Sequence, residues 1–405
     1  MKKLKDELND NTPKKSKHFI RNEKKLIKKR SKKRQKIINS KIRIKRFICI
    51  FSFVIVLFIF LLIIKKIIFY IKYILTKNIT KKKLKIGVVG VYHCMNAGNN
   101  LLKYSISVVL KEMGFIPYII GTNNNKTNLD FLSKTTNLIV VNNFSEIKRD
   151  DYDILMVNSD QTWRNFDGNL LDYGFLRFAE NWNLPKFIYG ASLGYDYWSF
   201  TSEETIVAKR LLTQFKGISI REQGSLNLIK QNLGITPEVV LDPTLLINKN
   251  YYLDLVHKYS KKKFDNEKYI LIYKLGWNIN MKKLIKKAFN ELKYKIYLFT
   301  LHNRTNIENF IYYINNSQAI ITDSFHGTIF SIIFNKPFVS FYYKGQAEER
   351  LKSLKNLFQI KNRIISSEEI ADVNLLKTPL NINYSIIEEL RLKSLDFIKK
   401  NLDII

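Results

Sequence analysis

The chain of 405 residues is poor in cysteine and in recognisable cofactor motifs. Its two cysteines, Cys49 and Cys94, fall in different parts of the chain, so neither a disulfide framework nor a cysteine-based metal site is predicted. The histidines are scattered, and no HxxxH or CxxC spacing occurs. The stretch "VGVYHCMNAG" matches neither a Walker A loop nor a GxGxxG fingerprint. We therefore expect neither a metal nor a cofactor.

Acidic residues are also scarce: 35 Asp and Glu stand against 68 Lys and Arg, for a net charge of +33. Residues 1–46 contribute +16 and residues 65–85 contribute +8 of this charge, which leaves +9 for residues 86–405. The first 46 residues contain a single phenylalanine and lack the interleaved aromatics of many nucleic-acid-binding segments. We predict a basic disordered arm over residues 1–46 and no nucleic-acid partner.

Between the basic segments lies a stretch of 18 residues without charge, "FICIFSFVIVLFIFLLII" at residues 47–64. As a helix it would be about 27 Å long, close to the roughly 30 Å of a hydrocarbon core, and flanking lysines can reach the interface. We predict a single-pass membrane anchor over residues 47–75 and a basic linker over residues 76–84, with membrane lipids as partners. A hairpin or a helix lying on anionic lipid is an alternative.

After the linker, short apolar strands alternate with helical patterns. "KIGVVGV" at residues 85–91 precedes apolar residues at helical spacing over residues 101–113, and "IPYII" follows. This order predicts parallel strands with helical crossovers. The pattern restarts near residues 200–216, so we predict two Rossmann-like domains, 85–205 and 206–365, with a cleft between them. Residues 366–405 are predicted to form a helical tail that packs back on the first domain.

Polar side chains cluster at the ends of the predicted strands, where ligands bind in open α/β sheets. In "AIITDSFHGTIFSIIF", the expected helix begins near Gly327-Thr328 and offers free N–H groups to an anion such as phosphate. Gly327 would let a ligand approach the backbone, and His326 would donate to a phosphate or act as an acid. Asp323 would cap the helix or orient His326. The alternative is that Asp323 and Ser324 only cap and His326 fills a turn.

Three other charged residues occupy comparable positions. Arg221, beside Glu222, suits a carboxylate or phosphate, although an ordinary ion pair explains it equally well. Asp160, at a strand end, could accept a proton from a hydroxyl or could cap a turn. Arg350 could reach an anion or lie as a solvated charge on a helix.

Six sequence segments, taken together, resemble those of a known protein family. In order they are "GVYHCMNAGNNLLKYSISVVLKEMGF", "DILMVNSDQTW", "YGASLG", "GISIREQGSLNLI", "VVLDPTLLI" and "ITDSFHGTIFSIIFNKPFVSF" with "EERLKSL". Together they resemble the polysaccharide pyruvyl transferase family over about residues 85–360. The resemblance implies a GT-B-like α/β fold. It also implies transfer of a pyruvyl group from phosphoenolpyruvate to sugar hydroxyls of a cell-surface glycan as a ketal, with a polysaccharide or lipid-linked sugar as acceptor.

The resemblance assigns roles to individual residues. By similarity, Arg221 is the arginine of the S-x-R-E motif, His326 is the motif histidine and Asp160 is the carboxylate of the G-S-D-Q motif. From these we expect His326 as acid and Asp160 as base. The expected donor-binding residues are Arg221, Ser324, His326, Gly327, Thr328, Lys274 and Arg350. The expected acceptor-binding residues are Asn96, Asn99, Asp160 and Gln161.

Two positions depart from the family pattern. Asn158 stands where relatives often have glycine, and Ser324 stands where some members have an arginine. The second change removes a cation for the donor, which Lys274, Arg304 or Arg350 would have to replace.

Two other functions compete with this interpretation. One is a GT-B glycosyltransferase that uses a sugar nucleotide, with Glu348 or Glu349 at the ribose. The other is a non-catalytic glycan-binding envelope protein. The basic excess before the predicted span favours a globular part across the membrane. Because phosphoenolpyruvate is cytosolic, we instead expect the catalytic domain on the cytoplasmic face; a compartment that imports the donor is the alternative.

Overall fold

The computed structural model divides the chain into two compact units, residues 1–82 and 83–405. The structure describes residues 60–61, 63–69, 83–91, 96–122, 129–165, 168–260, 267–276, 278–300, 307–345, 348–360 and 362–402. In the first unit, residues 60–61 and 63–69 are helical. Within the described residues, no helix combines the length and the apolar character needed to cross a membrane. The predicted arm and most of the predicted anchor and linker lie outside the described residues.

The second unit begins with a seven-stranded sheet in the order β3-β2-β1-β4-β5-β6-β7, in which all neighbouring strands are parallel. Its central strand β4 is buried along its whole length, as expected for a parallel strand covered on both faces. The order reverses between β1 and β4, and ligands bind at such a switch point. The strands are β1 (Lys85–Val89), β2 (Ile116–Thr122), β3 (Asn137–Val141), β4 (Ile154–Asp160), β5 (Lys186–Ala191), β6 (Gly217–Ile220) and β7 (Glu238–Val239).

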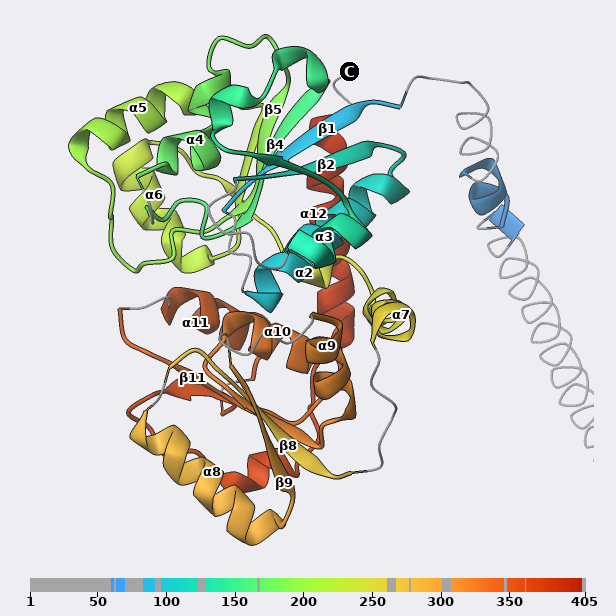
Figure 1. The fold of residues 1–405 in the computed structure, drawn as a ribbon, viewed down its shortest axis with the longest axis vertical. Coiled ribbons are helices and arrows are strands. Elements are labelled where there is room, and N and C mark those ends of the chain that lie inside the picture. Colours follow the sequence, from blue (N-terminus) through green and yellow to red (C-terminus); the bar gives the residue numbers. More distant parts are fainter. Residues whose placement is uncertain are drawn as a thin grey trace, which may run out of the picture. The chain divides into compact units, whose positions relative to one another are not determined.

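The second sheet has five parallel strands in the order β12-β11-β10-β8-β9. Figure 1 shows the two sheets of this unit with helices α2, α10 and α11 in the region between them. The strands are β8 (Tyr269–Lys274), β9 (Lys295–Thr300), β10 (Ala319–Thr322), β11 (Phe338–Tyr342) and β12 (Ile364–Ser366). The predicted α/β class with parallel sheets is confirmed.

Helices connect the strands in both sheets. Around the first sheet they are α2 (Ala97–Glu112), α3 (Leu129–Thr135), α4 (Leu170–Phe175), α5 (Ser202–Leu212) and α6 (Leu226–Leu233). Around the second they are α7 (Lys249–Tyr259), α8 (Ile279–Leu292), α9 (Ile307–Asn316), α10 (Phe325–Ile333) and α11 (Glu348–Leu357). Single-turn helices lie in the connections, namely Phe144–Glu146, Arg149–Asp151, Arg177–Ala179, Gln223–Ser225, Pro243–Leu245 and Val373–Leu376.

The predicted domain boundary at residues 205/206 is wrong. Strand β6 pairs with β5, with Phe187 opposite Gly217, so residues 206–239 continue the first sheet. The helix at residues 202–212 is therefore an ordinary crossover between two strands of one sheet. The chain passes to the second sheet between Val239 and Tyr269. As a consequence, Arg221 belongs to the first domain, whereas the sequence had placed it in the second.

The C-terminal helix α12 (Tyr384–Leu402), red in Figure 1, returns to the first domain. The Leu241 N–H donates to Ser394 Oγ at 2.9 Å, and the rings of Tyr189 and Phe397 lie 6.2 Å apart. Apolar side chains from both sheets also form one cluster, in which Tyr252 meets Phe330 edge-to-face at 5.0 Å. The two sheets are thus joined by a shared core as well as by the chain.

Helix α10 begins earlier than the sequence predicts, at Phe325 rather than near Gly327. Gly327 has a role in packing. A Cβ at this position would lie 2.8 Å from Tyr273 Cδ1 and would overlap the side chain of Thr322. The glycine therefore allows α10 to pack closely on β8 and β10, and the approach of a ligand to its backbone stays a prediction.

Candidate active site

Residues from both domains line a cavity of about 570 Å³ at the strand ends, which we call the central pocket. From the first domain these are Asn96, Asp160, Gln161, Arg164 and Tyr195. From the second they are Leu275, Gly276, Asp323, Ser324, Phe325, His326, Tyr342, Tyr343, Arg350 and Leu351. The pocket thus lies where both sheets present the carboxyl ends of their strands, the usual place for a ligand in such folds.

Asp160 ends the central strand β4 and is nearly inaccessible, with 6% of its surface exposed. Its φ of 77° lies in the left-handed region, which a non-glycine residue adopts only when its surroundings impose it. Oδ1 lies 3.4 Å from Arg221 Nη2 and 3.5 Å from Arg350 Nη1. Burial alone would raise the pKa of Asp160, but the neighbouring positive charges, led by Arg221, hold it well below its usual range. Asp160 is therefore a carboxylate and a weak base.

A second contact fixes the other oxygen of Asp160. Asn99 Nδ2 donates to Asp160 Oδ2 at 2.8 Å, and the buried Lys103 Nζ donates to Asn99 Oδ1 at 2.7 Å. Because an ammonium group only donates, it can face only the oxygen of the Asn99 amide. Lys103 therefore orients the amide so that its N–H₂ points at Asp160. Asn99, expected to bind acceptor, instead supports the carboxylate from behind the pocket.

Arg221 is surrounded by acids. Its guanidinium pairs with Asp242, lies 3.4 Å from Asp160, and has Nε 3.7 Å from Glu222. Only 2% of the side chain is exposed, and the guanidinium carbon lies 4.9 Å from the centroid of the Phe325 ring. Arg221 is absent from the residues that line the central pocket. Arg221 is therefore the centre of a buried charge network, and its charge is already balanced by acidic side chains.

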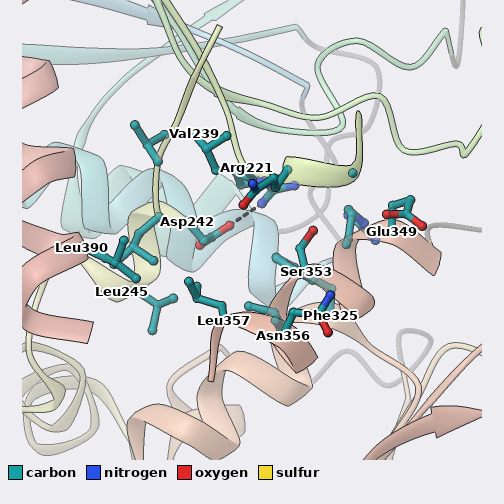
Figure 2. A pocket seen from close by; sticks show the side chains of 16 residues that line it. Arg221, Val239, Asp242, Leu245, Phe325, Glu349, Ser353, Asn356, Leu357 and Leu390 are labelled. Carbon is teal, nitrogen blue, oxygen red and sulfur yellow. Dashed lines mark hydrogen bonds and ion pairs between the residues drawn. The ribbon is translucent and has the colours of Figure 1, made fainter. Parts of the chain in front are cut away.

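Arg221 faces a neighbouring cavity of about 430 Å³ instead. Figure 2 shows Arg221 and Asp242 joined across one wall of this cavity, with Leu245, Leu357 and Leu390 along another. Phe325 and Arg350 line both cavities. The neighbouring cavity mixes aliphatic side chains with polar ones such as Glu349, Ser353 and Asn356, and His326 and Asp160 line only the central pocket.

His326 lies in the first turn of α10 and is 4% exposed. The start of α2 lies against its ring, since a Cβ at Gly98 would overlap the imidazole. Nε2 is 3.8 Å from Asp242 Oδ2 and has no hydrogen-bond partner among the residues that the structure describes. Burial lowers the pKa of His326, against the opposing pull of Asp242 and Asp160. At neutral pH the imidazole is neutral, which suits a proton acceptor better than the acid expected from the sequence.

The remaining predicted residues divide into two groups. Ser324 lines the pocket and caps α10, because its Oγ accepts from the Gly327 N–H at 3.3 Å. Thr328 is buried and bonds to Ser340 Oγ at 2.7 Å, so it does not face the pocket. Lys274 ends β8 but does not line the pocket either.

Among the other candidates, Asn96 and Gln161 line the central pocket, as expected for acceptor residues. Arg350 also lines it, and its side chain is 13% exposed. Arg304 lies outside the described residues, so the structure does not place it.

Sequence reasoning missed Arg164. It lines the pocket, donates from Nη1 to Gln161 Oε1 at 3.1 Å, and lies 4.0 Å from the Tyr195 ring centroid. Its position four residues after Asp160, at the same strand end, is the signal that could have revealed it.

Burial lowers the pKa of Arg350, and the charges of Arg221 and Arg164 lower it further. Positive charges that repel one another in a pocket are stabilised by an anionic ligand.

The contacts of Asp323 differ from those expected from the sequence, which were a helix cap or a bond to His326. It accepts from the backbone N–H groups of Leu275 and Gly276 at 2.6 and 2.8 Å, and from the Tyr343 hydroxyl at 3.3 Å. It therefore joins the ends of β8 and β10 and neither caps α10 nor orients His326.

Across the described ranges, no cluster of His, Cys, Asp and Glu side chains is arranged to hold a metal.

Comparison with known proteins supports the resemblance. Residues 96–345 match the family described as polysaccharide pyruvyl transferase. The chain belongs to this family. It is accordingly a transferase of polysaccharide biosynthesis. No curated protein matched the sequence.

Solved structures give the fold. UDP-GlcNAc 2-epimerase from Neisseria meningitidis, bound to UDP-GlcNAc, is 13% identical, with a TM-score of 0.51 over 78% of this chain and 99% of that one. UDP-GlcNAc 2-epimerase from Methanocaldococcus jannaschii is 14% identical, with a TM-score of 0.48 over 78% and 100%. The first likeness shows the fold alone, the GT-B-type pairing of two parallel α/β sheets.

Replacing Arg221 tests the buried charge network. We expect Arg221→Met to lower the free energy of unfolding by about 3–5 kcal/mol, because it leaves buried carboxylates without their cation. The measurement is urea unfolding followed by tryptophan fluorescence. The control is Arg210→Met, which removes an arginine that pairs with Glu180 at the surface and should cost about 1 kcal/mol or less. Equal losses in the two variants would contradict the network.

Proposed function

We propose that the central pocket binds phosphoenolpyruvate and transfers its pyruvyl group, as a ketal, to two hydroxyls of a glycan. The observation that carries this proposal is the set of groups around one cavity. Two guanidinium groups, Arg164 and Arg350, line it together with the imidazole of His326. Phosphoenolpyruvate has two anionic groups, a phosphate and a carboxylate, and guanidinium binds both in a planar, bidentate manner.

Arg350 can supply the positive charge that is lost because Ser324 stands in place of an arginine. Relatives with an arginine at that position have a cation next to the histidine, and here α11 brings Arg350 to the same pocket. Its contact with Asp160 at 3.5 Å holds the guanidinium in place before the donor arrives. Arg221, which we expected to bind donor, supports this arrangement through Asp160 and Phe325.

We assign proton transfer to His326. Its Nε2 accepts the proton of the first attacking hydroxyl and passes it to the methylene carbon of phosphoenolpyruvate, which becomes a methyl group as the hydroxyl oxygen bonds to C2. The second hydroxyl then bonds to C2 as the C2–O bond to phosphate breaks, and its proton leaves with the phosphate. The two hydroxyl protons end on the methyl group and on phosphate, so no further reactant is needed.

Asp160 takes a different role from the base expected from the sequence. A carboxylate whose pKa is held low is a weak base, so we assign Asp160 a role in stabilising positive charge. Its negative charge favours the imidazolium that forms on His326 during transfer and fixes the position of Arg350. Gln161 and Asn96 line the same pocket and would donate to acceptor hydroxyls.

We further propose that residues 47–75 attach this domain to the cytoplasmic face of a membrane. The uncharged stretch and its basic flanks support the attachment, since lysines close to a surface of anionic lipid each add favourable energy. The cytosolic location of the proposed donor supports the orientation.

The direct test is an assay of the full chain with phosphoenolpyruvate and candidate glycans, measuring phosphate release and, by mass spectrometry, the pyruvyl increment on the glycan. We expect Arg350→Gln to raise the KM for phosphoenolpyruvate roughly 10- to 100-fold, because it removes a charge-assisted hydrogen bond. Lys352→Gln, a change on the same helix outside the pocket, is the matched control and should leave this KM unchanged. Transfer from UDP-sugars without phosphate release from phosphoenolpyruvate would favour the glycosyltransferase instead.

The pH dependence tests the role of His326. Because its pKa is lowered from the usual 6.5, the imidazole is neutral at and above that pH and becomes protonated only as the pH falls below it. We expect His326→Gln to reduce kcat/KM about 10²- to 10⁴-fold at pH 7.5. The ratio of wild-type to variant kcat/KM, which cancels titration of the donor, should be constant above pH 6.5 and fall at lower pH.

The exposed His257 on α7 supplies the control, since His257→Gln should keep both the rate and the wild-type pH profile. A ratio that instead rises as the pH falls would show that protonated His326 is the active form, as the acid role requires.

A further inference from the structure

The loop between β5 and α5 carries two stacked tyrosines at the central pocket. Tyr195 lines the pocket, and Tyr197 stacks on it with ring centroids 4.9 Å apart and an interplanar angle of 23°. Tyr195 is held from another direction by the Arg164 guanidinium, 4.0 Å from its ring centroid. Tyr197, however, is 55% exposed. We call this pair the aromatic ledge.

The exposure of Tyr197 does not come from a loosely held loop. Glu349 N–H, at the start of α11, donates to Asp196 Oδ1 at 3.1 Å, and Trp198 Nε1–H donates to Thr205 Oγ1 at 3.0 Å. The residues immediately before and after Tyr197 are therefore each tied to a helix, and Gly194 makes the turn into the loop with a φ of 71°. An aromatic ring is thus presented to solvent from a fixed position.

We propose that the aromatic ledge is an acceptor subsite that stacks against a sugar ring next to the one that reacts. This inference rests on the proposed function of the central pocket. A pyranose ring has an apolar C–H face and a rim of hydroxyls, which matches a tyrosine ring with its apolar face and polar tip. Tyrosine also supplies such a surface at a low cost in side-chain entropy.

The position of the ledge favours the acceptor over the donor. Phosphoenolpyruvate is small and anionic, and the cations that suit it, Arg164 and Arg350, line the pocket itself. A glycan is longer than the pocket and must extend out of it. Tyr195 belongs to the pocket wall and Tyr197 continues from it to the solvent-exposed surface, so the ledge lies along a path that leaves the reacting sugar.

The test uses the full chain and the accepted glycan from the phosphate-release assay. We expect Tyr197→Ala to raise the KM for the glycan about tenfold through loss of the stacked ring, with kcat and the KM for phosphoenolpyruvate unchanged. Tyr197→Phe keeps the ring and should stay within about twofold of wild type. Phe289→Ala removes an aromatic side chain of similar exposure, 58%, from α8 and should have no effect.

A second readout separates failure of the ledge from failure of the proposed chemistry. Saturation-transfer NMR with a panel of neutral hexose and N-acetylhexosamine disaccharides measures binding without turnover. Saccharide contact with wild type that is lost in Tyr197→Ala supports the ledge even if no phosphate is released from phosphoenolpyruvate, a result that would refute only the proposed function. Unchanged glycan KM in Tyr197→Ala, or no saccharide binding by wild type that binds phosphoenolpyruvate, overturns the ledge and leaves the proposed function intact.

Discussion

The contact between Asp160 and the guanidinium groups of Arg221 and Arg350 is the constraint on which the site depends. Asp160 and Arg221 end strands of the first sheet, and Arg350 comes from α11 of the second domain. Charges this deeply buried are tolerated only when they are paired, so the two domains must keep the spacing that pairs them. Burial lowers the pKa of the nearby His326 and the two guanidinium groups add to this effect, while Asp242 and Asp160 oppose it.

This electrostatic arrangement divides the work in a way that residue types alone do not indicate. A histidine and an aspartate at strand ends suggested an acid and a base. Their surroundings favour a proton acceptor at His326 and disfavour a base at Asp160, because the cations that hold Asp160 ionised also make it a poor proton acceptor. Arg221 is drawn into the network by Asp242, and the cations left to line the central pocket are Arg164 and Arg350.

Much of the fold followed from the sequence, and the failures have physical causes. Apolar strands that end in polar residues predicted parallel sheets and placed Asp160 and His326 at strand ends, and in the structure both line the central pocket. The domain boundary failed because the crossover before β6 has the same pattern as a start of a new domain, and only strand pairing distinguishes the two. The packing role of Gly327 could not be predicted from the sequence, because close helix–strand packing and ligand approach both favour glycine. Arg164 was missed because its approach to the pocket depends on Tyr195, over thirty positions away in the chain.

The most direct test is a crystal structure of the protein with phosphoenolpyruvate. We expect phosphoenolpyruvate to lie in the central pocket, with one anionic group hydrogen-bonded to Arg350 and the other near Arg164. Its methylene carbon should face His326 Nε2. A donor bound in the neighbouring cavity beside Leu245 and Leu357, or bound in the central pocket without contact to Arg350, would contradict this assignment.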